Sequence, residues 1–137
     1  MTREQLEIQI KEDLQGVHHM ICMAILDTLL SNAWSVNHLL SIDDLLVFLP
    51  LFCPPERLIQ LLPYMTLSRT HLLDGKVYFV DENQKTEMTH DQFGTAKQGF
   101  IRHPVTNEIL DYELNSERIK MFYAASDVIK NILRGQS

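Results

Sequence analysis

The chain has 137 residues and a formal net charge of −6, with 45% hydrophobic and 22% charged side chains. These fractions exclude wholesale disorder, and the length is sufficient for one domain with a substantial core. The acidic excess is concentrated in residues 1–50, which hold two basic and seven acidic side chains. Because such a chain repels phosphate at long range, general nucleic-acid binding is disfavoured.

The cysteines and the hydropathy pattern indicate where the protein works. Cys22 and Cys53 are the only two cysteines, which is too few for a disulfide framework, and no secretory signal precedes them. The longest apolar run, from Met20 to Leu26, is far too short to span a bilayer. We therefore expect a soluble, intracellular protein, cytoplasmic or nuclear, that does not insert into a membrane.

A capping box marks the start of the first predicted element. The hydroxyl of Thr2 and the side chain of Gln5 are three residues apart, which is typical of a helix N-terminus. The pattern predicts an N-terminal helix or arm over residues 1–31, in which Gly16 marks either a bend or a division into two helices. Its apolar positions form a narrow stripe that would face a partner helix or pack internally. The candidate partner-binding residues are Leu6, Ile10, Leu14 and Val17.

A second helix is predicted after Ser41. The serine hydroxyl can cap it, and Asp43 and Asp44 lie favourably in its positively charged first turn. Pro50 and the Pro54-Pro55 pair close this element. Its predicted core face contains Ile42, Leu45, Leu46, Phe48 and Leu49.

Residues 53–80 form the stretch around which the fold is predicted. Pro55 suits a first helical position, and Pro63 is expected to prevent a long continuation. A second short helix is then predicted from residue 66 to 73, with Leu67 among its apolar anchors and Gly75 as its left-handed stop. The alternative places Asp74-Gly75 in a hairpin turn after a strand over 70–73. In either case a strand follows over 76–80, with a polar tip at 81–85 and a return over 86–88.

This order of elements, with the segment LLDGKVYFVD at residues 72–81, resembles the winged-helix, or helix-turn-helix, superfamily over roughly residues 41–88. The resemblance implies a recognition helix that runs into a wing strand. Winged-helix proteins include dimeric DNA-binding regulators, and also acidic scaffolding subunits of larger complexes.

The last third of the chain is predicted in two parts. Residues 89–115 are irregular or form a hairpin, in which 100–101 and 108–112 pair around a loop at 104–107. Asn115 or Ser116 then caps a C-terminal helix over residues 116–134, which Gly135 ends. The overall prediction is a mainly α fold with a small β-hairpin, of class α+β, in which long N- and C-terminal helices flank a winged-helix-like core.

The sequence offers little support for catalysis. His18 and Cys22 are four residues apart on a helix, but no further ligands occur at zinc-site spacing, so no metal site and no cofactor is predicted. No nucleophile elbow or glycine-rich phosphate loop is recognisable. We therefore expect a protein that is not an enzyme.

The best case for nucleic-acid contact is the expected recognition helix with two lysines nearby that could reach phosphates. These candidate residues are Thr66, Ser68, Arg69, Thr70, His71, Lys76 and Lys85. Neighbouring acidic side chains dilute their positive charge. The first functional hypothesis is therefore a non-enzymatic protein–protein interaction module, self-associating or part of a larger assembly, with a protein partner or a second copy. The alternative is a dimeric winged-helix DNA-binding transcription regulator.

Overall fold

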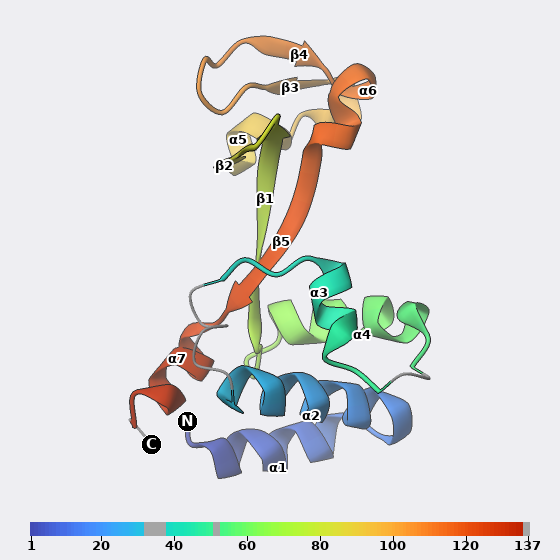
Figure 1. Ribbon diagram of the computed structural model, residues 1–137, viewed down its shortest axis with the longest axis vertical. Helices are drawn as coiled ribbons and strands as arrows, with labels where there is room; N and C mark the ends of the chain where they lie inside the picture. The colour runs from blue at the N-terminus through green and yellow to red at the C-terminus, as the bar shows by residue number, and fades with distance from the viewer. Residues whose placement is uncertain (32–37, 51–52, 136–137) are drawn as a thin grey trace. The chain divides into compact units, whose positions relative to one another are not determined.

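The structure, a computed structural model, describes residues 1–31, 38–50 and 53–135. Helices and short antiparallel sheets alternate along the chain, so the α+β class is confirmed (Figure 1). The sequence predicted a single domain over residues 1–137, and this stays a prediction. The chain contains two compact units: unit 1 comprises Met1–Asp74 and Tyr123–Ser137, and unit 2 comprises Gly75–Phe122.

Unit 1 begins with a helical hairpin, so Gly16 marks a division into two helices, one of the two outcomes expected for it. Helices α1 (Arg3–Asp13) and α2 (Gly16–Ser31) are separated because Gly16 has a φ of +60°, a left-handed conformation that glycine adopts without steric cost. The predicted capping box at Thr2 is present. Arg3 links the two helices through its guanidinium, which lies 2.6 Å from the carboxylate of Asp27. The two helices lie side by side in Figure 1.

Helix α3 (Ile42–Val47) begins as predicted. The hydroxyl of Ser41 accepts from the amide of Asp44 at 3.1 Å, and the Asp44 carboxylate accepts from the amide of Ser41 at 2.9 Å. Just before it, Leu40 forms an antiparallel bridge with Tyr123 through two hydrogen bonds of 2.7 Å. This bridge joins segments of unit 1 that are far apart in the sequence.

Helix α4 (Pro55–Leu67) corrects the prediction of two short helices. It starts at Pro55 as expected but continues through Pro63. An internal proline costs about 3 kcal/mol. The extra turn, however, buries Met65 completely beside Leu62, and each such side chain contributes roughly 1.5–3 kcal/mol. Burial of the inner face therefore offsets the missing hydrogen bond.

Residues 68–72 form a turn, and β1 (Leu73–Asp81) follows. The predicted recognition helix over 66–73 is therefore wrong, because these residues are the end of α4, a turn and the start of a strand. Gly75 lies inside β1, so it neither ends a helix nor sits in a hairpin turn. Both interpretations of Asp74-Gly75 are therefore wrong. Because residues 66–73 do not form a recognition helix, the structure does not support the resemblance to the winged-helix superfamily in this segment.

The predicted C-terminal helix over 116–134 is also wrong in its first half. A short 3₁₀ turn, η3 (Ser116–Arg118), leads into β5 (Ile119–Ala125). Tyr123 and Ala125 lie two residues apart on the same face of this strand, and both belong to the buried core of unit 1. Ser126 then caps α7 (Asp127–Leu133), and Gly135 follows its end with a φ of +77°, as predicted for a helix stop.

The core of unit 1 is formed by the inner faces of these helices and by the ends of the two long strands. Its fully buried members supply most of the apolar burial in this unit. They are Leu6, Ile10, Ile21, Cys22, Ile25, Leu26, Leu29, Leu45, Leu58, Met65, Leu72, Leu73, Ala125 and Ile129.

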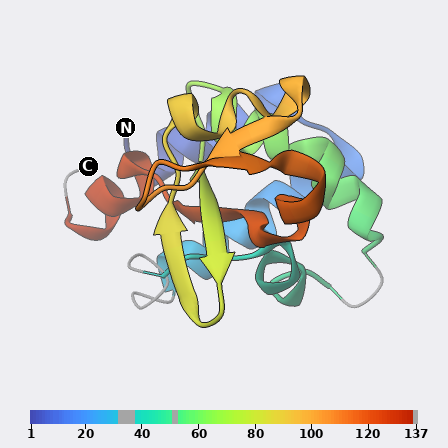
Figure 2. The same ribbon diagram turned by 90° about the horizontal axis from the view of Figure 1, so that it is seen from above.

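Unit 2 is built on a β-hairpin. Strand β2 (Gln84–Glu87) pairs antiparallel with β1, so the hairpin expected over residues 76–88 is present, and the sheet order is β2-β1-β5 (Figure 2). The turn contains Glu82 at a φ of 54°, which is unusual for a residue other than glycine.

The rest of unit 2 is a small covering layer. Helix α5 (His90–Phe93) and the 3₁₀ turn η2 (Ala96–Gln98) precede a second hairpin. This hairpin pairs β3 (Phe100–Arg102) with β4 (Ile109–Asp111), as considered for the segment 89–115, and α6 (Tyr112–Asn115) follows it. The core of unit 2 is small, with Phe79, Met88 and Ile101 as its buried members.

Across the described part of the chain, the helices are too short or too polar to cross a lipid bilayer.

Candidate functional site

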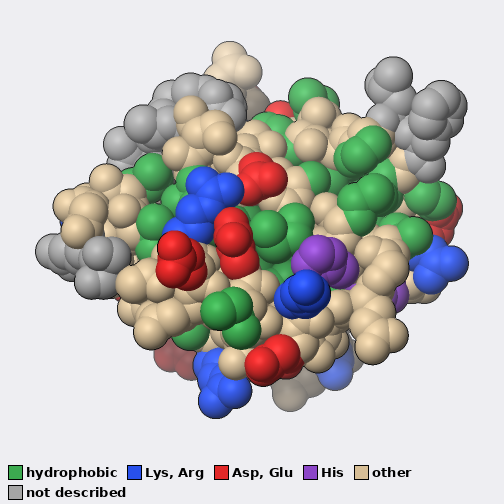
Figure 3. Space-filling view, turned by 90° about the horizontal axis from the view of Figure 1, so that it is seen from below, with side chains coloured by type: hydrophobic (Ala, Val, Ile, Leu, Met, Phe, Trp, Pro, Cys, Tyr) green, Lys and Arg blue, Asp and Glu red, His purple; other side chains and the backbone are tan. Residues whose placement is uncertain are grey.

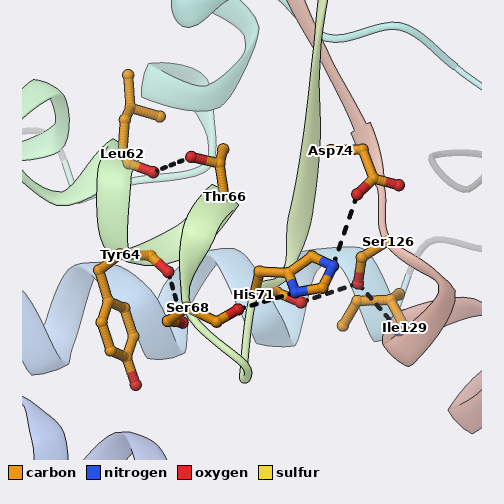
Figure 4. Close-up of polar contacts among 8 residues, drawn as sticks. All are labelled: Leu62, Tyr64, Thr66, Ser68, His71, Asp74, Ser126 and Ile129. Carbon is orange, nitrogen blue, oxygen red and sulfur yellow. Dashed lines mark hydrogen bonds and ion pairs between the residues drawn. The ribbon is translucent and has the colours of Figure 1, made fainter.

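The turn between α4 and β1 is a polar region of unit 1 in which several hydrogen bonds converge. Its backbone folds back on the last turn of α4, because the amide of Leu72 donates to the carbonyl of Met65 at 2.9 Å and that of His71 donates to Ser68 at 3.1 Å. Five of the predicted nucleic-acid residues lie in this turn or in the last residues of α4 before it. Figure 4 shows the polar contacts of this region.

A chain of hydroxyl groups closes this turn against α1. Thr70 donates to the phenol oxygen of Tyr64 at 2.9 Å, and Tyr64 donates to the carboxylate of Asp13 at 2.7 Å. Ser68 donates to the main-chain carbonyl of Tyr64 at 2.7 Å. Each hydroxyl has one proton, and each proton is used in these bonds. The 3.1 Å contact between the Ser68 and Thr70 hydroxyls therefore adds no further hydrogen bond.

Tyr64 keeps its proton over the whole physiological range. Burial raises the pKa of Tyr64 to about 12; the hydrogen bond from Thr70 opposes this shift, and the bond to Asp13 with its negative charge reinforces it. The phenol therefore remains a hydrogen-bond donor to Asp13. The two hydrogen bonds are donated in one direction, from Thr70 to Tyr64 and from Tyr64 to Asp13. They act as a structural tie between α4 and α1.

His71 is held in the same turn with its ring directed away from Tyr64 (Figure 4). Its Nδ1 lies 2.9 Å from the carbonyl of Ser68, so Nδ1 carries a proton, since a carbonyl can only accept. Its Nε2 lies 3.6 Å from the carboxylate of Asp74. Ser126 donates to the main-chain oxygen of His71 at 2.9 Å, not to the ring. A serine, a histidine and an aspartate are therefore close together without the nucleophile-to-base hydrogen bond that catalysis needs.

The predicted nucleic-acid residues do not share one exposed face. Thr66 bonds to the carbonyl of Leu62 at 2.8 Å, and Thr70 is only 1% exposed. Arg69 is exposed and makes one long contact, of 3.4 Å, to Gln9. The two remaining predicted residues, Lys76 and Lys85, belong to strands of unit 2. The seven residues thus separate into one hydroxyl bonded within α4, two hydroxyls that close the turn, the turn histidine, one exposed arginine and two strand lysines.

The predicted partner-binding stripe is divided in a similar way. Leu6 and Ile10 are fully buried in the core of unit 1, and Leu14 is half-buried against that core. Val17 is 44% exposed. The first two residues are therefore satisfied within the chain, and they cannot meet a partner while the fold is intact. Binding through Val17 stays a prediction.

The outer side of α4 carries an apolar line that the sequence reasoning missed. Ile59 and Leu67, the second of which was predicted as an apolar anchor of a separate helix, are 52% and 83% exposed, and Pro63 between them is exposed as well. Residues spaced by four form a ridge on a helix surface, and such ridges pack into grooves of other helices. Extending the helical period through Pro63 would have placed all three residues opposite Leu58, Leu62 and Met65.

The pocket beside α3 in unit 1 has little capacity for chemistry. Its volume is about 340 Å³, and it is lined by His38, Leu39, Leu40, Asp44, Val47 and Phe48. Its carboxylate, Asp44, already serves the capping box.

The pair considered for a metal site is in α2. Cys22 is fully buried, and burial raises its pKa to about 12, so the thiolate that binds metals is disfavoured. His18 has a buried Nε2 atom for which the structure shows no partner. Within the described ranges, no three His, Cys, Asp or Glu side chains gather closely enough to hold a metal ion.

Charges are mixed on the face drawn in Figure 3. Lysine and arginine side chains alternate there with aspartate and glutamate, and hydrophobic side chains lie between them. In comparisons with protein-family models, curated proteins and solved structures, nothing matches this chain.

Proposed function

We propose that this chain is a non-enzymatic protein–protein interaction module that packs the outer side of α4 against a helix of another molecule, with a second copy as the partner. The observation that carries this proposal is the exposed ridge of Ile59, Pro63 and Leu67. We call these three residues the α4 ridge. Isolated surface hydrophobics are ordinary, but three along one line of a helix match an anchor pattern for helix recognition.

The charges beside the α4 ridge favour pairing with a second copy. Glu56 lies on the same side of α4, one turn before Ile59, and the exposed Arg69 follows the end of the helix. An antiparallel two-fold pair of α4 helices brings the acidic end of one ridge beside the basic end of the other, twice. Such complementarity sets orientation and specificity more than affinity.

The expected affinity is weak. From the exposed fractions, burying the α4 ridge contributes roughly 4 kcal/mol per copy, or about 8 kcal/mol for a pair. Lost translational and rotational freedom costs at least about 4 kcal/mol. At most about 4 kcal/mol remains, which corresponds to a dissociation constant of about 1 mM or weaker. A long-lived complex would therefore need further contacts, as in a subunit of a larger assembly.

Concentration-dependent light scattering tests this proposal. The average mass should rise as the chain is concentrated toward the millimolar range, and Leu67→Glu should prevent the rise because it places a charge on the ridge. Val47→Glu is the matched control, since Val47 is 81% exposed but lies on α3. A constant mass for the wild-type chain, or equal effects of the two variants, would overturn the proposal.

The dimeric winged-helix DNA-binding regulator gains no observation of its own. The segment in which its recognition helix was expected has another structure, and its hydroxyl groups are used inside unit 1. No observation of the structure therefore favours DNA binding by this turn as a second candidate function.

A further inference from the structure

The sheet of unit 2 has one face that its core does not use. Side chains alternate between the two faces of a strand. Val77, Phe79 and Ile119 belong to the core of unit 2, so they define the inner face of β1 and β5. The register pairs Tyr78 with Glu87 and Val80 with Lys85, which places these residues together on the opposite face. We call this opposite side the outer sheet face; it carries Lys76, Tyr78, Val80, Lys85, Glu87, Lys120 and Phe122.

Side-chain contacts on the outer sheet face agree with this assignment. The rings of Tyr78 and Phe122 meet edge to face, with their centroids 5.5 Å apart. The ammonium group of Lys85 lies 4.5 Å from the centroid of the Phe122 ring. Lys76 lies 3.8 Å from the carboxylate of Glu87 across the hairpin. Two aromatic rings are thus held side by side among lysines.

The charge of the outer sheet face differs from that of the chain. It carries three lysines and one glutamate, whereas the chain as a whole has a net charge of −6. Lys85 and Lys120 are exposed, and the side chain of Lys76 is 41% exposed. A local positive field on an acidic protein selects a partner of opposite charge at short range.

We propose that the outer sheet face binds single-stranded nucleic acid. The half-buried ring of Tyr78 provides a surface on which a base stacks, and the three lysines contact the phosphates on either side. Phe122, which is only 8% exposed, supports the Tyr78 ring from below, and the ammonium group of Lys85 beside it remains available to a phosphate. Base faces are available only in single strands, so a duplex binds less well. An acidic peptide would use the lysines and leave the rings without a role.

Fluorescence anisotropy of a short labelled oligothymidylate with the full chain tests this inference. Binding is expected in low salt, and Tyr78→Ala should weaken it about tenfold because stacking is lost. Tyr78→Phe keeps the ring and should bind as the wild type does. Lys120→Gln should weaken binding and reduce the slope of log K against log salt by about 0.7, the value for one phosphate contact on a single strand.

The control is Lys97→Gln, which removes an exposed lysine of η2, outside the sheet, and should leave binding unchanged. Circular dichroism of each variant shows whether the fold is retained. Three results would each overturn the inference: no binding in low salt, equal losses from Lys97→Gln and Lys120→Gln, or displacement of the oligonucleotide by poly-glutamate with no effect of Tyr78→Ala. The last result would assign the face to acidic peptides.

Discussion

The tie between α1 and α4 through Tyr64 can be tested quantitatively. Tyr64→Phe removes the phenol oxygen, which donates to Asp13 and accepts from Thr70. A hydrogen bond to a charged group contributes about 1.5–3 kcal/mol, but Asp13 is exposed and can bind water instead, so about 1 kcal/mol is expected for this bond. Thr70 is buried and loses a neutral bond of about 1 kcal/mol. The variant should lose about 2 kcal/mol in total.

Urea unfolding of a double-mutant cycle separates the two bonds. Tyr64→Phe, Asp13→Ala and the double variant should give a coupling energy of about 1 kcal/mol. Thr70→Val, which keeps the volume and removes the hydroxyl, should cost about 1 kcal/mol by itself. A coupling energy near zero would refute the direct bond between Tyr64 and Asp13. A full-sized loss in Tyr64→Phe with no coupling to Asp13 would place its contribution in the bond from Thr70 and in packing.

Three further predictions concern stability. Burial raises the pKa of Cys22 from 9.0 to about 12, so the unfolded chain loses this proton first as the pH rises. The free energy of unfolding should therefore be constant below pH 9 and fall above it, by about 2–3 kcal/mol between pH 8 and 11. In urea unfolding, Cys22→Ala should show a smaller fall. Gly16→Ala should cost about 1–2 kcal/mol because the φ of +60° disfavours a side chain although the space is open, and Gly16→Asn should cost less in the same assay. Glu82→Gly should raise the melting temperature by relieving a φ of 54°, whereas Glu82→Ala should not, and equal effects of the two changes would contradict this reasoning.

Features that depend on neighbouring residues were predictable from the sequence. The capping boxes at Thr2 and Ser41 need only a hydroxyl and an acceptor three residues later, so both helix starts were placed correctly. The hairpin after Gly75 was found from its strand-forming residues and its polar tip. Gly135 ends the last helix as expected, because its role is also local.

Features that depend on distant contacts were not predictable. Pro63 continues a helix because the opposite face is buried, and a proline taken alone indicates a break. Residues 119–125 match a helical period by spacing, but they form a strand that pairs with β1, about forty residues earlier. Tertiary burial overrode the local pattern in both cases.

The candidate sites show the same division. The polar residues after α4 were identified as a cluster, but their hydroxyls close a turn, which requires knowledge of where Tyr64 and Asp13 lie. The α4 ridge was missed because the helix was ended too early. The outer sheet face was missed because β5, which carries Lys120 and Phe122, was predicted as a helix and becomes a neighbour of β1 only in the fold.

Photo-crosslinking from position 67 tests the central claim most directly. A benzoyl-phenylalanine placed there in the full chain, which is then irradiated near the millimolar range, should link to residues 56–63 of a second copy. This result follows because an antiparallel pair brings the end of one α4 ridge beside the start of the other. The same group at position 47 should give far less product. Crosslinks from position 67 that map to other surfaces, or equal yields from both positions, would contradict the account.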